Sequence, residues 1–215
     1  MIAKYLSVIA KNWLFYFMLA MIIITCTHSR GLGAGIAWNV ANGLGYAAFT
    51  TLLLTCFSRP VRLNNLSHRS LGYVTLLFTS LHISILLISD PVTIEYLKPN
   101  APLYMWLGSF SAIFMVFIII SSLTHFKNIF YNSTGNFKKA HRIMSWLIVI
   151  GCLCHIIVSG FYISQQWQIM TLIIVAIFSL WPVNIKRLSP INIYYLAPLL
   201  MAFMIIFIGL WGWSS

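Results

Sequence analysis

The chain has 215 residues, of which 60% are hydrophobic and only 7% are charged. A soluble domain could not cover so much apolar surface, so this composition favours an integral membrane protein. The formal net charge is +11, but the basic residues form short clusters between apolar runs, and no continuous basic patch suggests nucleic acid as a partner.

Apolar runs close to the roughly 20 residues that a helix needs to cross a bilayer follow one another along the whole chain. They cover residues 12–27, 36–57, 68–89, 104–125, 141–163, 168–186 and 191–213. Glycine and proline residues interrupt the sequence between them, as in loops, and no internal domain boundary is evident. We therefore predict an all-α integral membrane protein whose residues 1–215 form a single bundle of six to seven transmembrane helices.

Lysine and arginine residues divide unequally between the two sets of predicted loops. Of the 13 in the chain, all but Arg30 and Lys98 fall on one side. Because cytoplasmic loops are enriched in basic residues, we expect the amino terminus in the cytoplasm and the carboxyl terminus outside.

Four of the six histidines repeat one spacing. His82 follows His68 by 14 residues, and His155 follows His141 by 14 residues. Fourteen residues are close to four turns of α-helix, so both members of each set lie on one helix face, ~21 Å apart along its axis. The third and fifth predicted spans run in the same direction. We therefore expect His68 to meet His141 at one membrane depth and His82 to meet His155 at another.

An imidazole inside a membrane helix is costly unless its nitrogens have partners, so these histidines are candidate functional residues. Haem iron is commonly held by histidine nitrogens, and cofactor sites in bundles are built from facing helices. The pattern predicts a two-haem ladder, with His68 and His141 on the inner iron and His82 and His155 on the outer iron. An alternative role for a single membrane histidine is a hydrogen bond between helices.

Two other kinds of residue lie near these histidines. Arg69 and Arg142 directly follow the inner histidines and are candidates to pair with haem propionates, although membrane orientation alone also explains basic residues there. Gly72 and Gly151 each lie one helical turn from a histidine, where a small residue would let a macrocycle approach the backbone.

The segments Leu66-Ser-His68-Arg69-Ser-Leu-Gly72 and Ala140-His141-Arg142, each leading to a second histidine, resemble the ferric reductase-like transmembrane domain family. That family includes ferric reductases, NADPH oxidases and the haem membrane subunit that serves a bacterial periplasmic methionine sulfoxide reductase. It places haem-ligating histidine pairs on its third and fifth helices. The resemblance covers about residues 36–186 and implies two haem b groups. It also implies a location in a membrane, here the bacterial inner or plasma membrane.

Flavocytochromes of that family continue into a cytoplasmic domain that binds FAD and NAD(P)H. Here an extra apolar run, at about 191–213, follows the family-like core, and the sequence contains no nucleotide-binding fingerprint. We therefore expect no flavin site in this chain, and we expect a flavoprotein or another redox partner to supply electrons in trans.

The sequence thus predicts an oxidoreductase membrane subunit, a ferric reductase-like di-haem cytochrome b. It would pass electrons from a cytoplasmic flavoprotein or quinol to an extracytoplasmic acceptor. One alternative is another di-haem cytochrome b, linked to quinol or ascorbate, with its ligands on other helices. A second is a transporter whose histidines relay protons or bind a metal. That transporter would bind no haem.

Overall fold

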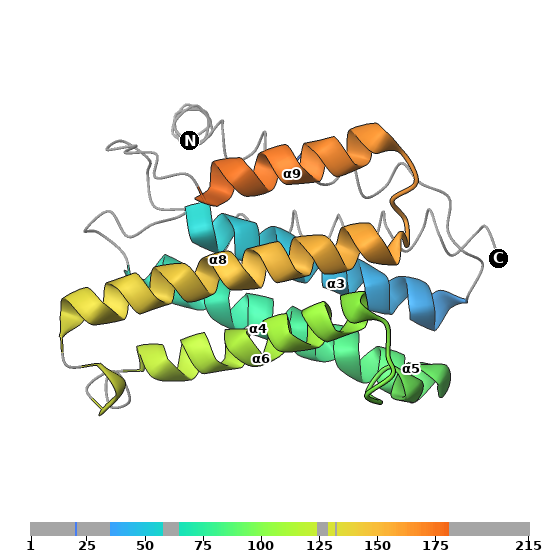
Figure 1. The fold of residues 1–215 in the computed structure, drawn as a ribbon, viewed down its shortest axis with the longest axis horizontal. Helices are drawn as coiled ribbons and strands as arrows, with labels where there is room; N and C mark the ends of the chain where they lie inside the picture. Colours follow the sequence, from blue (N-terminus) through green and yellow to red (C-terminus); the bar gives the residue numbers. More distant parts are fainter. Residues whose placement is uncertain (1–19, 21–34, 58–64, 124–128, 132, 181–215) are drawn as a thin grey trace, which may run out of the picture.

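The computed structural model describes residues 20, 35–57, 65–123, 129–131 and 133–180. The regular secondary structure in these ranges is helical, and they contain no β-strand. The helices are α3 (Ile36–Phe57), α4 (Asn65–Ser89), α5 (Val92–Glu95), α6 (Leu103–Ser122), α8 (Thr134–Ser159) and α9 (Gln166–Leu180) (Figure 1). The predicted spans at 12–27 and 191–213, and the end of the sixth span, lie outside the described residues.

The four long helices form two hairpins. α3 packs along α4, and α6 packs along α8. Contacts from residues 41 and 55 of α3 to residues 82 and 68 of α4, respectively, show that the first pair is antiparallel. α4 and α8 begin at the same end of the bundle and run in the same direction (Figure 1). The parallel course of these two helices agrees with the expectation for the third and fifth predicted spans.

α3 is the central helix of the described bundle, in contact with α4, α8 and α9. Nearly all of its side chains between residues 41 and 54 are buried. Buried Thr51 donates to backbone carbonyls of its own helix and accepts a hydrogen bond from Thr75 of α4 at 3.0 Å. Because protein rather than lipid surrounds α3, its polar side chains find partners that a lipid-facing helix would lack.

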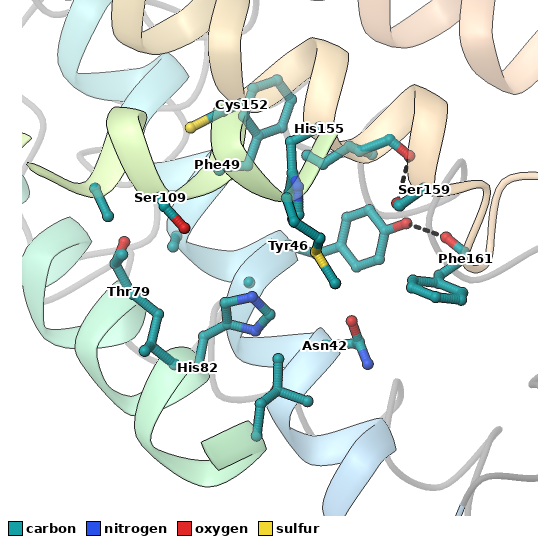
Figure 2. A pocket seen from close by; sticks show the side chains of 18 of the residues that line it. Asn42, Tyr46, Phe49, Thr79, His82, Ser109, Cys152, His155, Ser159 and Phe161 are labelled. Atoms are coloured by element: carbon teal, nitrogen blue, oxygen red, sulfur yellow. Dashed lines mark hydrogen bonds between the residues drawn. The ribbon is translucent and has the colours of Figure 1, made fainter. Parts of the chain in front are cut away.

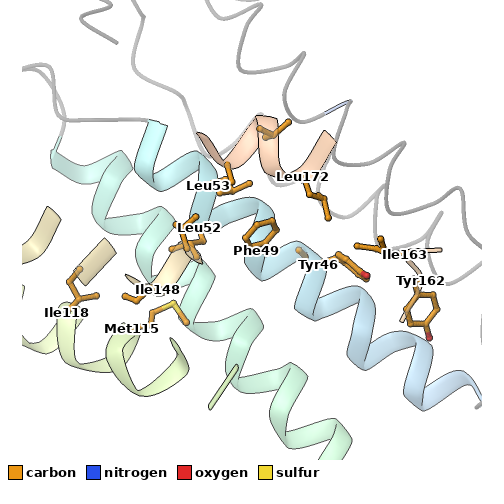
Figure 3. Close-up of a cluster of buried hydrophobic side chains, with 14 residues drawn as sticks. Tyr46, Phe49, Leu52, Leu53, Met115, Ile118, Ile148, Tyr162, Ile163 and Leu172 are labelled. Atoms are coloured by element: carbon orange, nitrogen blue, oxygen red, sulfur yellow. The ribbon is translucent and has the colours of Figure 1, made fainter. Parts of the chain in front are cut away.

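The apolar core lies along α3 and draws side chains from α6, α8 and α9 (Figure 3). Leu53, Ile148 and Leu172 are almost completely buried there. Where lipid replaces water around the protein, such close packing stabilises the bundle through dispersion contacts rather than through transfer of apolar surface out of water.

Three described helices are long and apolar enough to cross a membrane: His68–Ser89, Leu103–Ser122 and Thr134–Ser159. Their outer faces carry large apolar side chains with little protein cover, including Ile88, Ile113 and Val158. Lipid can cover such faces, because the helical backbone satisfies its own hydrogen bonds. These helices therefore have the length and the surface of a membrane bundle.

α8 differs from the predicted span 141–163 at both ends. It begins at Thr134, because the side chain of Ser133 accepts a hydrogen bond from the Asn136 N–H at 3.1 Å and caps the first turn. It ends at Ser159, because Gly160 adopts the left-handed conformation with φ 68° that terminates many helices. The predicted end at residue 163 was wrong. The predicted span 36–57 coincides with α3.

The turn after α8 is tied to α3 by two tyrosines. The hydroxyl of Tyr162 donates to Asn39 Oδ1 at 2.5 Å, and the hydroxyl of Tyr46 donates to the Phe161 carbonyl at 2.7 Å. Burial raises the pKa of Tyr162 to about 12. These bonds fix the end of α8, the helix that carries His141 and His155, against the centre of the bundle.

We expect Leu53→Ala to lower the free energy of unfolding by about 2–5 kcal/mol, because Leu53 is fully buried on α3 and truncation leaves a cavity. The matched control is Leu77→Ala on α4. Leu77 is 55% exposed, so detergent or lipid can fill the space and the change should stay within about 0.5 kcal/mol. Unfolding of the detergent-solubilised protein measures both. Equal losses would contradict the central position of α3.

Candidate functional site

His82 of α4 and His155 of α8, here called the second histidine pair, line one pocket. Both rings project into it from their two helices (Figure 2). The pocket is bounded by parts of α3, α5 and α6 as well, and its empty space, including the open mouth, amounts to about 1290 Å³. Most of the side chains around it are apolar. The two imidazoles thus lie in a largely apolar space.

The two rings of the second pair are held in the same way. Nδ1 of His82 lies 2.7 Å from the Ala41 carbonyl oxygen, and Nδ1 of His155 lies 2.7 Å from the Tyr104 carbonyl oxygen. A carbonyl oxygen only accepts hydrogen bonds, so Nδ1 carries the hydrogen in each ring. The other nitrogen, Nε2, then has a free lone pair. This is the tautomer in which a histidine ligates a metal through Nε2.

A glycine makes each of these hydrogen bonds possible. In a helix the carbonyl of residue i faces residue i+4, and the residues four positions after Ala41 and Tyr104 are Gly45 and Gly108. A Cβ at Gly45 would lie 3.0 Å from Nδ1 and Cε1 of the His82 ring, and a Cβ at Gly108 would lie 2.9 Å from Nδ1 of His155. Each imidazole therefore reaches the backbone only because its neighbouring helix lacks a side chain there.

His68 and His141, the first histidine pair, also lie together. Their ring centroids are 6.1 Å apart, with planes inclined at 53°. Nδ1 of His68 lies 3.2 Å from the Thr55 carbonyl oxygen, so His68 has the same tautomer as the second pair. The buried Nδ1 of His141 has no hydrogen-bond partner among the described residues. The ring of Phe137 packs against it, with centroids 5.3 Å apart.

Neither pair has the ligands for a bare metal ion. Within the described residues, no group of three or more His, Cys, Asp or Glu side chains could hold a metal. A structural zinc ion takes four protein ligands, and a catalytic one takes three. Two histidines facing each other suit a metal whose remaining ligands come from a macrocycle.

The other residues singled out from the sequence lie apart from the second pair. Arg69 and Arg142 are exposed, and neither lines its pocket. A Cβ at Gly72 would meet nothing within 4 Å, whereas Gly151 packs against Ser111 of α6. The sequence did not indicate that Gly108 faces His155, because residue spacing does not show which helix packs against a given glycine.

Comparison with known proteins gives one family. The family model described as "Ferric reductase like transmembrane component" matches residues 12–152 of this chain. The match begins before the expected core at residue 36, so it takes in the first apolar run, and it ends shortly before His155. No curated protein matches the chain, and no solved structure does.

We expect Gly108→Ala to displace the His155 ring and break its hydrogen bond to the Tyr104 carbonyl. The cost should be about 1–3 kcal/mol of folding free energy, from a lost buried hydrogen bond and local overpacking. Thermal unfolding in detergent measures it, and ¹⁵N spectra of histidine-labelled protein report the ring tautomer. Gly72→Ala is the matched control, since it adds a methyl group in open space. If both variants behave alike, the glycine at 108 does not position His155.

Proposed function

Because the chain belongs to the ferric reductase-like transmembrane component family, we propose that it is a di-haem b-type subunit that carries electrons across a membrane. Membership makes it an integral membrane protein that contacts lipid and takes part in electron transfer. The proposal adds the cofactors, their four histidine ligands and the course of the electrons.

The orientation of the second pair is the observation that carries the proposal. His82 and His155 project into one apolar pocket, and in both rings the Nδ1 hydrogen is bound by a backbone carbonyl. Both Nε2 lone pairs are therefore available to an iron between them. Gly45 and Gly108 leave no side chain over the rings, which supports a tightly fitted site rather than an accidental gap.

The first pair supports a second site. A separation of 6.1 Å between the centroids of His68 and His141 leaves room for one metal with a bond of roughly 2 Å to each ring. A buried ring nitrogen without a partner is costly, and His141 Nδ1 is such an atom among the described residues. We infer that His141 is retained, despite this cost, because it ligates iron and not because it forms a hydrogen bond between helices.

The chain's own residues would hold both irons in a form suited to electron exchange. Bound haem supplies one-electron reduction and oxidation. Two imidazoles on each iron leave no position open for dioxygen or substrate. The 14-residue spacing separates the pairs by ~21 Å along α4 and α8, so the histidines place two redox sites at different depths.

We further propose that electrons enter at the first pair, from a cytoplasmic flavoprotein or from quinol, and leave from the second pair to an extracytoplasmic acceptor. The distribution of basic residues supports this direction, because it favours the first pair at the cytoplasmic side of a bacterial plasma membrane. Arg69 and Arg142 would then lie beside the first iron site, where they are candidates for its propionates.

The transporter alternative has weaker support. A proton relay in a membrane commonly uses carboxylates, but the chain has only two acidic residues. Both lie outside the three described spans: Asp90 accepts a hydrogen bond from the Val92 N–H, and Glu95 forms an ion pair with Lys98.

Haem content per chain tests the proposal and the pairing together. We expect two haem b groups in the wild type and about one in His82→Ala, because bis-histidine ligation is lost at one iron. The double variant His82→Ala/His155→Ala should also keep about one, since both ligands serve the same iron. His82→Ala/His141→Ala should keep none. Pyridine haemochrome assays of purified protein give these ratios.

His125→Ala is the control, since His125 stands outside the repeated 14-residue spacing, and it should keep both haems. The pairing is contradicted if His82→Ala/His155→Ala loses both haems while His82→Ala/His141→Ala keeps one. A wild-type protein without haem, made in haem-replete cells, would overturn the proposed function itself.

A further inference from the structure

One end of the pocket around the second histidine pair carries polar groups that the four ligands leave unexplained. Trp38, in the first turn of α3, and Thr93, in α5, both line this pocket. The first turn of α3 and α5 lie at the same end of the bundle (Figure 1). Trp38 precedes Ala41, the hydrogen-bond partner of His82, by three residues, or ~4.5 Å along the helix.

Both residues have a buried polar atom without a partner. Trp38 Nε1 and Thr93 Oγ1 make no hydrogen bond within the described part of the chain, where His141 Nδ1 is the third such side-chain atom. An unsatisfied buried donor costs about 1–3 kcal/mol. Two in one pocket therefore indicate a bound group that satisfies them.

The chemistry of these atoms identifies that group as a hydrogen-bond acceptor. An indole N–H can only donate, so the partner missing from Trp38 must accept. The Thr93 hydroxyl can donate to the same kind of atom. Trp38 is also held in place, because its ring makes an edge-to-face contact with Phe161 at 5.6 Å between centroids. Its donor is thus fixed before any ligand binds.

A carboxylate is the acceptor that this pocket would need to recognise. A porphyrin of the b type is an apolar disc with two carboxylates at one edge, and buried carboxylates require donors. No lysine or arginine is among the described residues that line the pocket. The hydroxyls of Thr75 and Thr79, which also line it, already have acceptors within the protein. Trp38 and Thr93 therefore place buried donors without a protein partner among the described residues in this pocket.

We propose that Trp38 Nε1 and Thr93 Oγ1 bind the carboxylates of the porphyrin held by His82 and His155. This inference rests on the proposed function and adds an orientation to it: the carboxylate edge faces the end where α3 begins and α4 ends. At this site neutral donors would bind the porphyrin carboxylates, whereas Arg69 and Arg142 are the expected partners of the carboxylates at the first pair.

The test uses Trp38→Phe and Thr93→Val in the full-length, haem-loaded protein. Thr93→Val keeps the shape of the side chain and Trp38→Phe keeps an aromatic ring, and each variant removes one donor. We expect each to release one of the two haems to excess apomyoglobin about tenfold faster, as for the loss of a hydrogen bond to a charged group. Resonance Raman spectra should show shifted propionate bending bands for that haem, which a merely structural effect would leave unchanged.

Trp106→Phe and Thr171→Val are the matched controls, because neither residue lines the pocket. Both should release haem at the wild-type rate. Unchanged propionate bands in Trp38→Phe and Thr93→Val, with two haems still bound, would overturn this inference alone. If the wild type and His82→Ala contain the same number of haems, the second site itself is refuted, and the proposed function fails with it.

Discussion

The candidate site depends on two hydrogen bonds, from Nδ1 of His82 to the Ala41 carbonyl and from Nδ1 of His155 to the Tyr104 carbonyl. Each bond fixes the tautomer, the orientation of the ring and the direction of the Nε2 lone pair at once. Each also joins the two helices of one hairpin. The same contacts that join the helices of each hairpin therefore orient the histidines that we propose as haem ligands.

The two hairpins position their histidines by the same arrangement of residues. In each, the second helix supplies a histidine, and the first helix supplies a carbonyl exposed by a glycine four residues later, Gly45 or Gly108. The pocket forms where the hairpins face each other, so neither hairpin alone contains both rings. α3 holds this arrangement from the centre, and the hydrogen bonds of Tyr46 in α3 and Tyr162 after α8 fix the far end of α8 against it.

The sequence predicted what depends on periodicity alone. Spans of apolar residues and a 14-residue spacing need only helix geometry, so the helices and the approach of His68 to His141 followed from them. The position of Gly108 against His155 and the proposed roles of Trp38 and Thr93 did not follow, because they depend on which distant segment packs opposite each residue. The ends of α8 were misjudged for a local reason: a serine cap and a left-handed glycine override the limits of the apolar run.

The central claim is that imidazole pairs bind two irons, and the most direct measurement is made on the wild-type protein. Purified, detergent-solubilised protein would be examined by low-temperature EPR when oxidised and by absorption after dithionite reduction, with haem quantified per chain. We expect two low-spin b-type haems, each with bis-imidazole ligation. High-spin or five-coordinate haem, or protein that lacks haem after growth with ample supply, would contradict it.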